Sequence, residues 1–376
     1  MMILIKFFNV ILEIIYMPFK LLATEQKITF ISRQSDVESA DIKMLKECIE
    51  KKLPGCKVVT LTKTIHPGIK ASISYGFHML KQMYHTATSR IVILDTYCII
   101  ISLLHHKKTT FVIQMWHALG LMKKAGYSIL DQPEGRSNRL ASAMKLHRNY
   151  QMILASSGNC IEAFSEVFGY PVDKICICPL PRVDLLRSEK YINCTKQSIY
   201  SCFPKLVEKS TVVYAPTYRK EEEEMRIQIK RLLKEFPFEK YNLIINLHPL
   251  SEIKIDNEQV IWNAPFTTME LLTVADFVIS DYSSIIFEAA IMKKPLLFFP
   301  FDLMKYQSDR DFFIDYKSEV PGPICMNAKE LLEALSNYSY ERDRIYLFAQ
   351  KYVELSINNC TEQIVGKLKE IMEVCF

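Results

Sequence analysis

The chain has neither a C-x-x-C pair nor the spacing of a zinc site among its 11 cysteines, which are scattered and odd in number. This pattern argues against a disulfide framework and fits reduced, mostly buried thiols in a cytosolic protein. Cys176 and Cys178 lie in an apolar, strand-like run, which favours a core position over chemistry. We expect no metal ion and no other cofactor.

A strong charge of one sign is also missing. The net charge is +5 over 376 residues, and both signs are spread along the chain. So mild a bias is compatible with anionic substrates or an anionic membrane surface, but it is too weak to indicate a nucleic-acid partner. No internal repeat or low-complexity segment is evident. Hydrophobic residues make up 49% of the chain, which indicates an ordinary folded protein, and the length favours two domains.

The N-terminal segment lacks the uninterrupted apolar centre of a secretory signal. Residues 1–22 are strongly apolar, and the residues that interrupt them are Lys6, Asn9, Glu13, Pro18 and Lys20. Glu13 would be costly at the centre of a bilayer, and Pro18 is expected to end any helix. We therefore expect residues 1–24 to form an interfacial helix on the cytoplasmic face of the membrane, as a peripheral anchor. A single span and a packed core helix are the alternatives.

From residue 28 onward, short apolar runs alternate with longer helical patterns, which is typical of an α/β fold with doubly wound parallel sheets. The first series of expected strands covers residues 28–32, 57–61, 90–94, 111–115, 152–156 and 174–178. A second series, after a looser polar stretch at 188–208, covers 211–215, 242–247, 260–262, 277–280 and 296–299. We therefore expect two parallel-sheet domains, 25–195 and 196–376, that face a cleft. Residues 329–376 are expected to form two helices.

Residues 277–288 predict a phosphate-binding turn between a strand and a helix. The apolar run 277–280 is followed by four polar groups, and residues 285–294 then have a helical pattern. Ser283 or Ser284 would cap that helix, whose free N–H groups also suit an anion. A capped turn without a ligand is the alternative.

Further polar clusters follow other expected strands, where ligands of such folds bind. They contain His117 with Lys123 and Lys124, Arg182 with Asp184, residues 216–219, and His248. A single histidine after a strand is more often structural, and an Arg-x-Asp pair is usually a local salt bridge. Together these residues suit attack on a phosphate, because a histidine near its usual pKa of ~6.5 can take a proton from an alcohol. Arg182 and the helix start could hold a diphosphate.

Five segments together resemble the CDP-glycerol glycerophosphotransferase family, which contains the teichoic acid primases and polymerases. They are residues 114–124, 214–219, 247–249, 280–284 and 300–323, and the resemblance extends from about residue 28 to 324. It implies a GT-B fold and transfer of glycerol phosphate, or a related polyol phosphate, from a CDP-alcohol such as CDP-glycerol or CDP-ribitol. The acceptor would be lipid-linked or a polymer, and CMP would be released, in the synthesis of a teichoic acid-like or capsular polymer.

The resemblance also implies the site residues. His117 is the candidate general base, and His248 is associated with the diphosphate, so both are expected to be catalytic. The positions expected to bind the CDP-alcohol are His117, Ala118, Leu119, Gly120, Leu121, Arg182, Pro216, Thr217, Asn246, Leu247, His248, Ser283, Ser284 and Glu288. Because a carboxylate repels phosphate, we expect Glu288 to accept hydrogen bonds from the ribose hydroxyls.

The chain departs from the family pattern at two places. Ala118-Leu119-Gly120 stands where many members have Gly-Thr-Pro, and Asn246 stands where a basic residue is frequent. We expect both changes to affect which substrate is used more than which reaction is catalysed. Asp309 and Asp311 match a D-x-D metal motif only superficially, so no metal is expected there.

Two other functions remain open on the sequence. One is a GT-B glycosyltransferase that uses a nucleotide sugar, because fold does not determine donor chemistry. The other is a membrane-bound binding protein that has lost catalysis, against which the presence of His117, His248, Arg182 and the serine pair argues.

Overall fold

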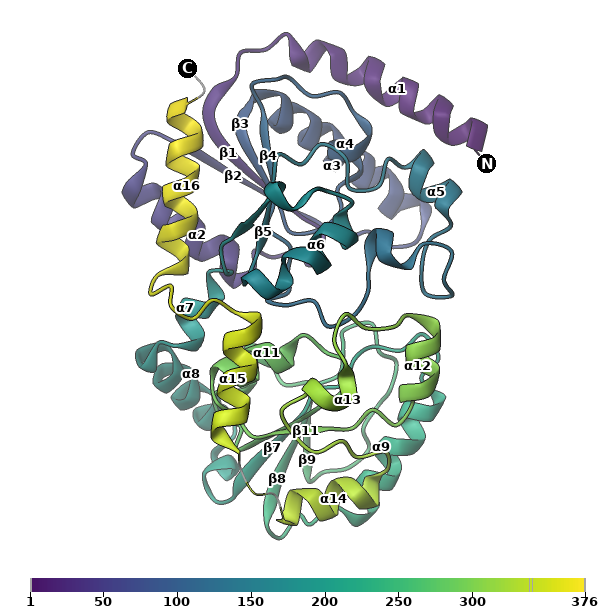
Figure 1. The fold of residues 1–376 in the computed structure, drawn as a ribbon, viewed down its shortest axis with the longest axis vertical. Coiled ribbons are helices and arrows are strands. Elements are labelled where there is room, and N and C mark those ends of the chain that lie inside the picture. The colour runs from purple at the N-terminus through teal and green to yellow at the C-terminus, as the bar shows by residue number, and fades with distance from the viewer. Residues whose placement is uncertain (1, 338, 340, 375–376) are drawn as a thin grey trace. The chain divides into compact units, whose positions relative to one another are not determined.

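The computed structural model describes residues 2–337, 339 and 341–374, without the side chains of residues 2–4 and 6. The chain divides into two compact units (Figure 1). The first unit consists of Met1–Ala118, Lys124–Asp184 and Ser356–Phe376, and the second of Leu119–Lys123 and Leu185–Leu355. The chain therefore passes between the units several times. The expected domain boundaries came from composition alone and remain a prediction.

The first unit is built on a six-stranded sheet with the order β2-β1-β3-β4-β5-β6, and every neighbouring pair is parallel. Six consecutive residues of β1 are buried, as expected for a parallel strand that is covered on both faces. The strands are β1 (Glu25–Ser32), β2 (Lys57–Thr62), β3 (Ser89–Leu94), β4 (Phe111–Gln114), β5 (Met152–Ala155) and β6 (Ile175–Ile177).

Helices cover this sheet. On the C-terminal helix, α16, the chain returns to the first unit, where α16 packs against α2 and β3 (Figure 1). The helices are α1 (Met2–Lys20), α2 (Ala40–Lys52), α3 (Ile69–Thr88), α4 (Ile99–Leu103), α5 (Asn138–Ala143), α6 (Ile161–Phe168), α7 (Arg182–Leu186), which enters the second unit, and α16 (Cys360–Val374). Short 3-10 turns lie at Gly126–Ile129, Gly158–Cys160 and Val172–Lys174.

The N-terminal helix α1 packs with its polar side toward the protein. Tyr16 is fully buried and its hydroxyl lies 3.0 Å from His106 Nδ1, while Asn9 donates to the Ala143 carbonyl at 3.3 Å. Glu13 accepts from the His105 main chain at 3.0 Å. The expectation that Pro18 ends the helix is wrong: α1 continues to Lys20, because a proline so near the end removes only one N–H···O bond. The side chain of Lys6 lies outside the described residues.

The second unit has a five-stranded sheet in the order β11-β10-β7-β8-β9, again parallel throughout. Its strands are β7 (Ser210–Tyr214), β8 (Tyr241–Ile245), β9 (Val260–Trp262), β10 (Phe277–Ser280) and β11 (Leu296–Phe298). Its helices are α8 (Glu189–Cys202), α9 (Glu223–Glu235), α10 (Thr268–Leu271), α11 (Ile285–Ile291), α12 (Leu303–Asp309), α13 (Tyr316–Glu319), α14 (Ala328–Asn337) and α15 (Arg342–Tyr352), with a 3-10 turn at Pro204–Val207.

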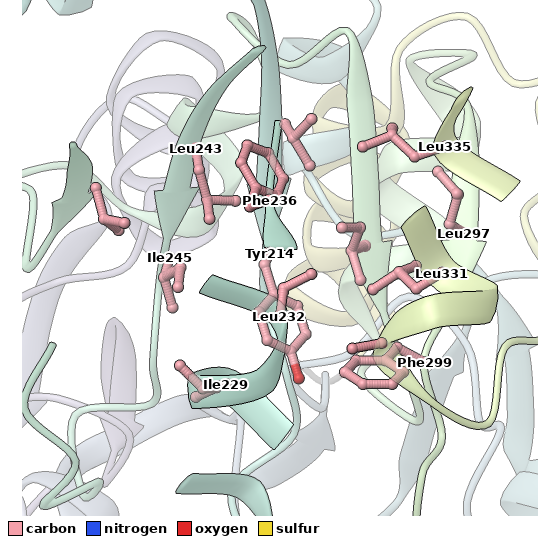
Figure 2. Packing of buried hydrophobic residues seen from close by; sticks show 14 of the residues in the cluster. Tyr214, Ile229, Leu232, Phe236, Leu243, Ile245, Leu297, Phe299, Leu331 and Leu335 are labelled. Atoms are coloured by element: carbon pink, nitrogen blue, oxygen red, sulfur yellow. The ribbon is translucent and has the colours of Figure 1, made fainter. Parts of the chain in front are cut away.

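One face of this sheet packs against α9 and α14, and Figure 2 shows the buried residues between them. Tyr214 of β7, Leu232 of α9 and Leu331 of α14 meet in this cluster, each fully buried. The second unit therefore has a hydrophobic core of its own, which holds the strand ends in place.

The predicted α/β fold with parallel sheets is confirmed, and all eleven expected strands are present in the described chain. One further expectation is wrong. The described part of residues 328–374 forms three helices rather than two, with breaks after Asn337 and after Tyr352, the second of them where the chain passes from the second unit to the first. The polar stretch at 188–208, for which no element was predicted, contains helix α8, whose first turn is capped by the Ser188 side chain.

Candidate active site

The second sheet reverses its chain order between β7 and β10. From β7 the chain moves to β8 and β9 on one side, then to β10 and β11 on the other. In open parallel sheets ligands bind beyond the carboxyl ends of the strands at such a switch point. The predicted residues Pro216, Thr217, Ser283 and Ser284 directly follow these two strands.

The turn after β7 is held by a buried carboxylate. The main-chain N–H of Thr217 donates to both oxygens of Asp281, at 2.9 and 3.2 Å. The hydroxyl oxygen of Thr217 is buried and has no hydrogen-bond partner among the described residues. An unpaired buried hydroxyl is costly, so its position indicates a partner supplied by a ligand or by water.

Arg219 braces the same turn. Its Nη1 lies 2.6 Å from Asp281 Oδ2, and its Nε and Nη2 contact the two oxygens of Asp302 at 3.0 and 2.9 Å. The guanidinium also lies over the ring of Tyr282, at 5.1 Å from the centroid. Arg219 is thus neutralised by two carboxylates, which makes it a structural residue of the site.

The loop after β8 carries His248. Its Nδ1 accepts from the Leu250 N–H at 3.1 Å, so in the neutral ring the proton is on Nε2, which is then a hydrogen-bond donor. Partial burial of the ring, and next the positive charge of Lys123, lower the pKa of His248 below its usual value. Asn246 donates to the Thr268 hydroxyl at 2.7 Å, and Leu247 packs on the hydrophobic core.

The helix after β10, α11, is shorter than predicted and ends at Ile291. Ser284 is its N-cap residue, but the one described side-chain bond at this end is from the Ile285 N–H to Ser283 Oγ, at a long 3.5 Å. Both serines are half-buried. Glu288 lies in the first turn of α11 and is 5% exposed.

Residues 119–123 belong to the second unit, although the chain on either side belongs to the first. Leu119 and Leu121 are buried there. A Cβ atom on Gly120 would lie 2.7 Å from the ring of Phe287 in α11, so this position requires glycine. The predicted residues of this segment therefore lie beside α11, on the same unit as His248.

His117 and Ala118 belong to the first unit. His117 Nδ1 lies 3.1 Å from the carbonyl oxygen of Asp95, and a carbonyl can only accept. Nδ1 therefore carries a proton, and Nε2 is the basic nitrogen of the neutral ring. Trp116, at φ +62°, makes the sharp turn after β4 that presents the histidine.

Arg182 also lies in the first unit, at the start of α7. Its main-chain N–H and its Nε both donate to the carboxylate of Asp41, each at 2.8 Å. Asp184 accepts from the main-chain N–H groups of Cys360 and Thr361, at the start of α16. Arg182 thus has an ionic partner in the described structure, and its expected contact with the diphosphate remains a prediction.

Sequence reasoning did not single out Asp281, which holds the turn after β7. Asp281 stands inside the predicted turn, and its central place among polar residues at a strand end was the available signal. Among the described residues, no group of three or more His, Cys, Asp or Glu side chains is arranged to hold a metal ion. At the D-x-D segment, Asp309 ends α12 and Arg310 is its C-cap.

The fold is of the α/β class with two parallel sheets, and polar side chains follow the strands at the switch point of the second sheet. The family model of CDP-glycerol:poly(glycerophosphate) glycerophosphotransferases matches residues 14–370. The chain belongs to this family, which confirms the predicted resemblance and the predicted enzyme class, a CDP-alcohol phosphotransferase.

Curated relatives agree with this assignment. The chain is 27% identical to a teichoic acid ribitol-phosphate primase of Bacillus spizizenii over 92% of its length and 91% of the relative. It is 27% identical to a teichoic acid glycerol-phosphate primase of Bacillus subtilis over 78% of its length and 77% of the relative. A poly(ribitol-phosphate) polymerase of Bacillus spizizenii is 29% identical over 77% of the chain, which spans 48% of that relative.

Among solved structures, the wall teichoic acid polymerase TagF has the same fold. The TM-score is 0.77 at 21% identity, covering 99% of this chain and 98% of that one. A UDP-GlcNAc 2-epimerase from Neisseria meningitidis has a TM-score of 0.59 at 15% identity, covering 92% and 99%. The fold is therefore shared with enzymes of other chemistry, and the assignment of function depends on the family and the site.

Proposed function

We propose that this enzyme transfers glycerol phosphate or ribitol phosphate from the CDP-alcohol to a hydroxyl of a lipid-linked or polymer acceptor. Family membership supports this proposal, and the observation that carries it is the cluster of predicted donor residues at the switch point of the second sheet. In this proposal the enzyme has a GT-B architecture, in which the second unit binds the CDP-alcohol and the first supplies the base.

The proposed reaction is one displacement at phosphorus. The acceptor oxygen attacks the phosphorus that carries the polyol, and its proton passes to Nε2 of His117. The bond from that phosphorus to the bridging oxygen breaks, and CMP leaves with the bridging oxygen and its electron pair. The hydrogen bond from Nδ1 of His117 to the Asp95 carbonyl supports this role, because it leaves Nε2 without a proton.

The donor site is proposed to act mainly by hydrogen bonding. The Nε2–H of His248 and the hydroxyl of Thr217 would donate to phosphate oxygens, and Ser283 and Ser284 would add two further hydroxyls. Glu288 would accept from the ribose hydroxyls. Arg182 would reach the diphosphate only by exchanging part of its bonding with Asp41.

We further propose that the first unit binds a membrane surface through α1 and α3. None of the described helices is long and apolar enough to cross a membrane. The outward side of α1 is nevertheless apolar, and α3 adds a stripe at helical spacing that contains Ile69, Ile73 and Phe77, 58–81% exposed. The two helices are in contact, with the rings of Phe19 and Tyr84 6.2 Å apart. Exposed patches of this kind mark interaction sites.

The test of the reaction is CMP release from CDP-glycerol and CDP-ribitol, compared with UDP release from UDP-glucose and UDP-N-acetylglucosamine. We expect His117→Gln to abolish CMP release while the donor still binds. His66→Gln is the matched control, because His66 is an exposed histidine of the same unit. Release of UDP instead of CMP, or an undiminished rate in His117→Gln, would contradict the proposal. Counting the units added to each acceptor distinguishes a primase from a polymerase.

The membrane proposal is tested by co-sedimentation with vesicles that contain anionic phospholipid. Replacing Phe8, Ile14 and Phe77, all exposed, with serine should abolish vesicle binding and leave CMP release from the CDP-alcohol in the presence of a soluble acceptor unchanged. A matched control replaces the exposed Leu250 and Met304 of the second unit with serine. Equal sedimentation of the α1–α3 variant and the wild type would refute this surface.

A further inference from the structure

Lys123 is held in the second unit by its main chain. The Phe313 N–H donates to the Met122 carbonyl at 2.8 Å, and Lys123 itself pairs with Phe312 in an isolated antiparallel bridge. Met122 is buried, and Gly120 lies against the ring of Phe287. The segment is therefore fixed at both ends, so the position of Lys123 is set by the fold.

The charged neighbours of Lys123 are mostly positive. Arg310 and Arg219 face it, and His248 is within electrostatic reach. The nearby anion, Asp281, already accepts from Arg219 and from the Thr217 N–H. Among the described residues, the ammonium of Lys123 has no hydrogen-bond or ion-pair partner. Burial, and next the charge of Arg310, lower the pKa of Lys123 to about 7.

An ammonium group placed among cations, with the nearby Asp281 already bonded to Arg219, is destabilising in the free protein. The charge of Lys123 nevertheless reaches His248, whose Nε2–H is a donor. It also reaches Asp281, which holds the main chain of Thr217, a residue whose buried hydroxyl lacks a described partner. All three groups belong to the second unit and are positive or able to donate. An anion placed there would satisfy all of them together.

We propose that Lys123 is a phosphate-binding residue of the donor site, which binds the diphosphate of the CDP-alcohol together with His248. This inference rests on the proposed function. Lysine suits the task as a compact point charge on a flexible stem. When the bond to the bridging oxygen breaks, the charge on the departing CMP grows, and Lys123 would stabilise it.

The proposal has a pH signature. A diphosphate would stabilise the ammonium form of Lys123, so binding would take up a proton above pH 7. If only the ammonium form binds, affinity should fall about fivefold between pH 7 and pH 8. Besides Arg310 and Asp281, the titratable groups around Lys123 are Arg219 and His248. Asp281 and Asp302 raise the pKa of Arg219, which stays charged over this range, and His248, whose pKa burial lowers, stays neutral.

The experiment is calorimetric binding of CDP, CDP-glycerol and cytidine to the full chain. Lys123→Gln should lower the affinity for CDP and for CDP-glycerol by roughly tenfold or more, as expected for the loss of one charge-assisted hydrogen bond, while the affinity for cytidine is unchanged. Lys123→Arg should retain CDP binding and lose the pH dependence, because a guanidinium stays protonated. Lys329→Gln, an exposed lysine on α14, is the matched charge control.

Equal CDP affinity in Lys123→Gln and the wild type would overturn the proposal, as would an unchanged pH slope in Lys123→Arg. If Lys123→Gln does not fold, the pH dependence of CDP binding by Lys123→Arg decides whether the proposal holds. If the wild type binds UDP-glucose and no CDP-alcohol, the proposed function fails. The same variants then test Lys123 with UDP as the diphosphate.

Discussion

Replacing Asp281 with asparagine would test how the donor site is built. The Asp281 side chain is fully buried and accepts from Arg219 Nη1 at 2.6 Å, from the Thr217 N–H and from the Tyr282 N–H. An asparagine has the same shape, but one of its two ends can only donate. At least one of these N–H groups would therefore face another donor.

The expected cost follows from these bonds. Breaking a buried ion pair costs about 3–5 kcal/mol, and Arg219 moderates the loss because it keeps both bonds to Asp302. An unsatisfied N–H at Thr217 or Tyr282 adds about 1–3 kcal/mol. We expect Asp281→Asn to lower the free energy of unfolding of the second unit by about 3–5 kcal/mol. Freeing the turn after β7 should also weaken donor binding.

The assay can report the second unit alone. The chain has two tryptophans, Trp116 in the first unit and Trp262 in the second, so urea unfolding in a Trp116→Phe background follows Trp262 fluorescence. Asp302→Asn is the matched control, because it disturbs the same arginine without touching Thr217. A loss below 1 kcal/mol in Asp281→Asn, or equal donor affinity in the two variants, would refute the assigned role of Asp281.

Three further results are expected. Gly120→Ala should displace residues 119–123, because its Cβ would meet the ring of Phe287, which is stacked on Phe348. We expect a loss of about 1–3 kcal/mol in the free energy of unfolding and a higher KM for the donor. An unchanged melting temperature and an unchanged KM would contradict this packing. Burial raises the pKa of Asp95 to about 6, so its carboxylate destabilises the first unit above that pH. Asp95→Asn should therefore raise the melting temperature at pH 7 but not at pH 4. Burial lowers the pKa of His106 to about 4, so stability should be lost as the pH falls from 6.5 toward 4, and a His106→Gln variant with the same pH dependence would exclude this histidine as the cause.

The strands, and the polar residues that follow them, were predictable because they depend on short-range patterns. Apolar runs that end in polar residues mark buried parallel strands, and the carboxyl ends of such strands lie at one edge of the sheet. This reasoning located Thr217, His248 and the two serines without knowledge of the strand order. The family itself was identified by the resemblance of five short segments, and the match to residues 14–370 confirms it.

What the sequence could not show depends on contacts between distant residues. The pairing of Arg219 with Asp281 and Asp302 joins residues more than sixty positions apart. The sequence pattern showed the polar side of α1. It did not show that Glu13 would bond to the main chain of His105, or Tyr16 to the ring of His106. The break between α15 and α16 falls where the chain passes from the second unit to the first, a point that hydrophobic periodicity does not mark.

The two histidines show how one sequence signal can lead to two chemical roles. His117 and His248 both follow a parallel strand, and both would titrate near neutrality in isolation. A carbonyl of Asp95 puts the proton of His117 on Nδ1, whereas the N–H of Leu250 puts the proton of neutral His248 on Nε2. The first ring can therefore take a proton at Nε2, and the second can donate a hydrogen bond from the same atom. Main-chain groups set this difference between the two rings. An amide side chain that places a nitrogen or an oxygen where the ring had Nδ1 should therefore keep the same main-chain hydrogen bond. Asparagine, whose amide reproduces the Nδ1–H donor of His117 but not the basic Nε2, would then retain the local structure and lose the base.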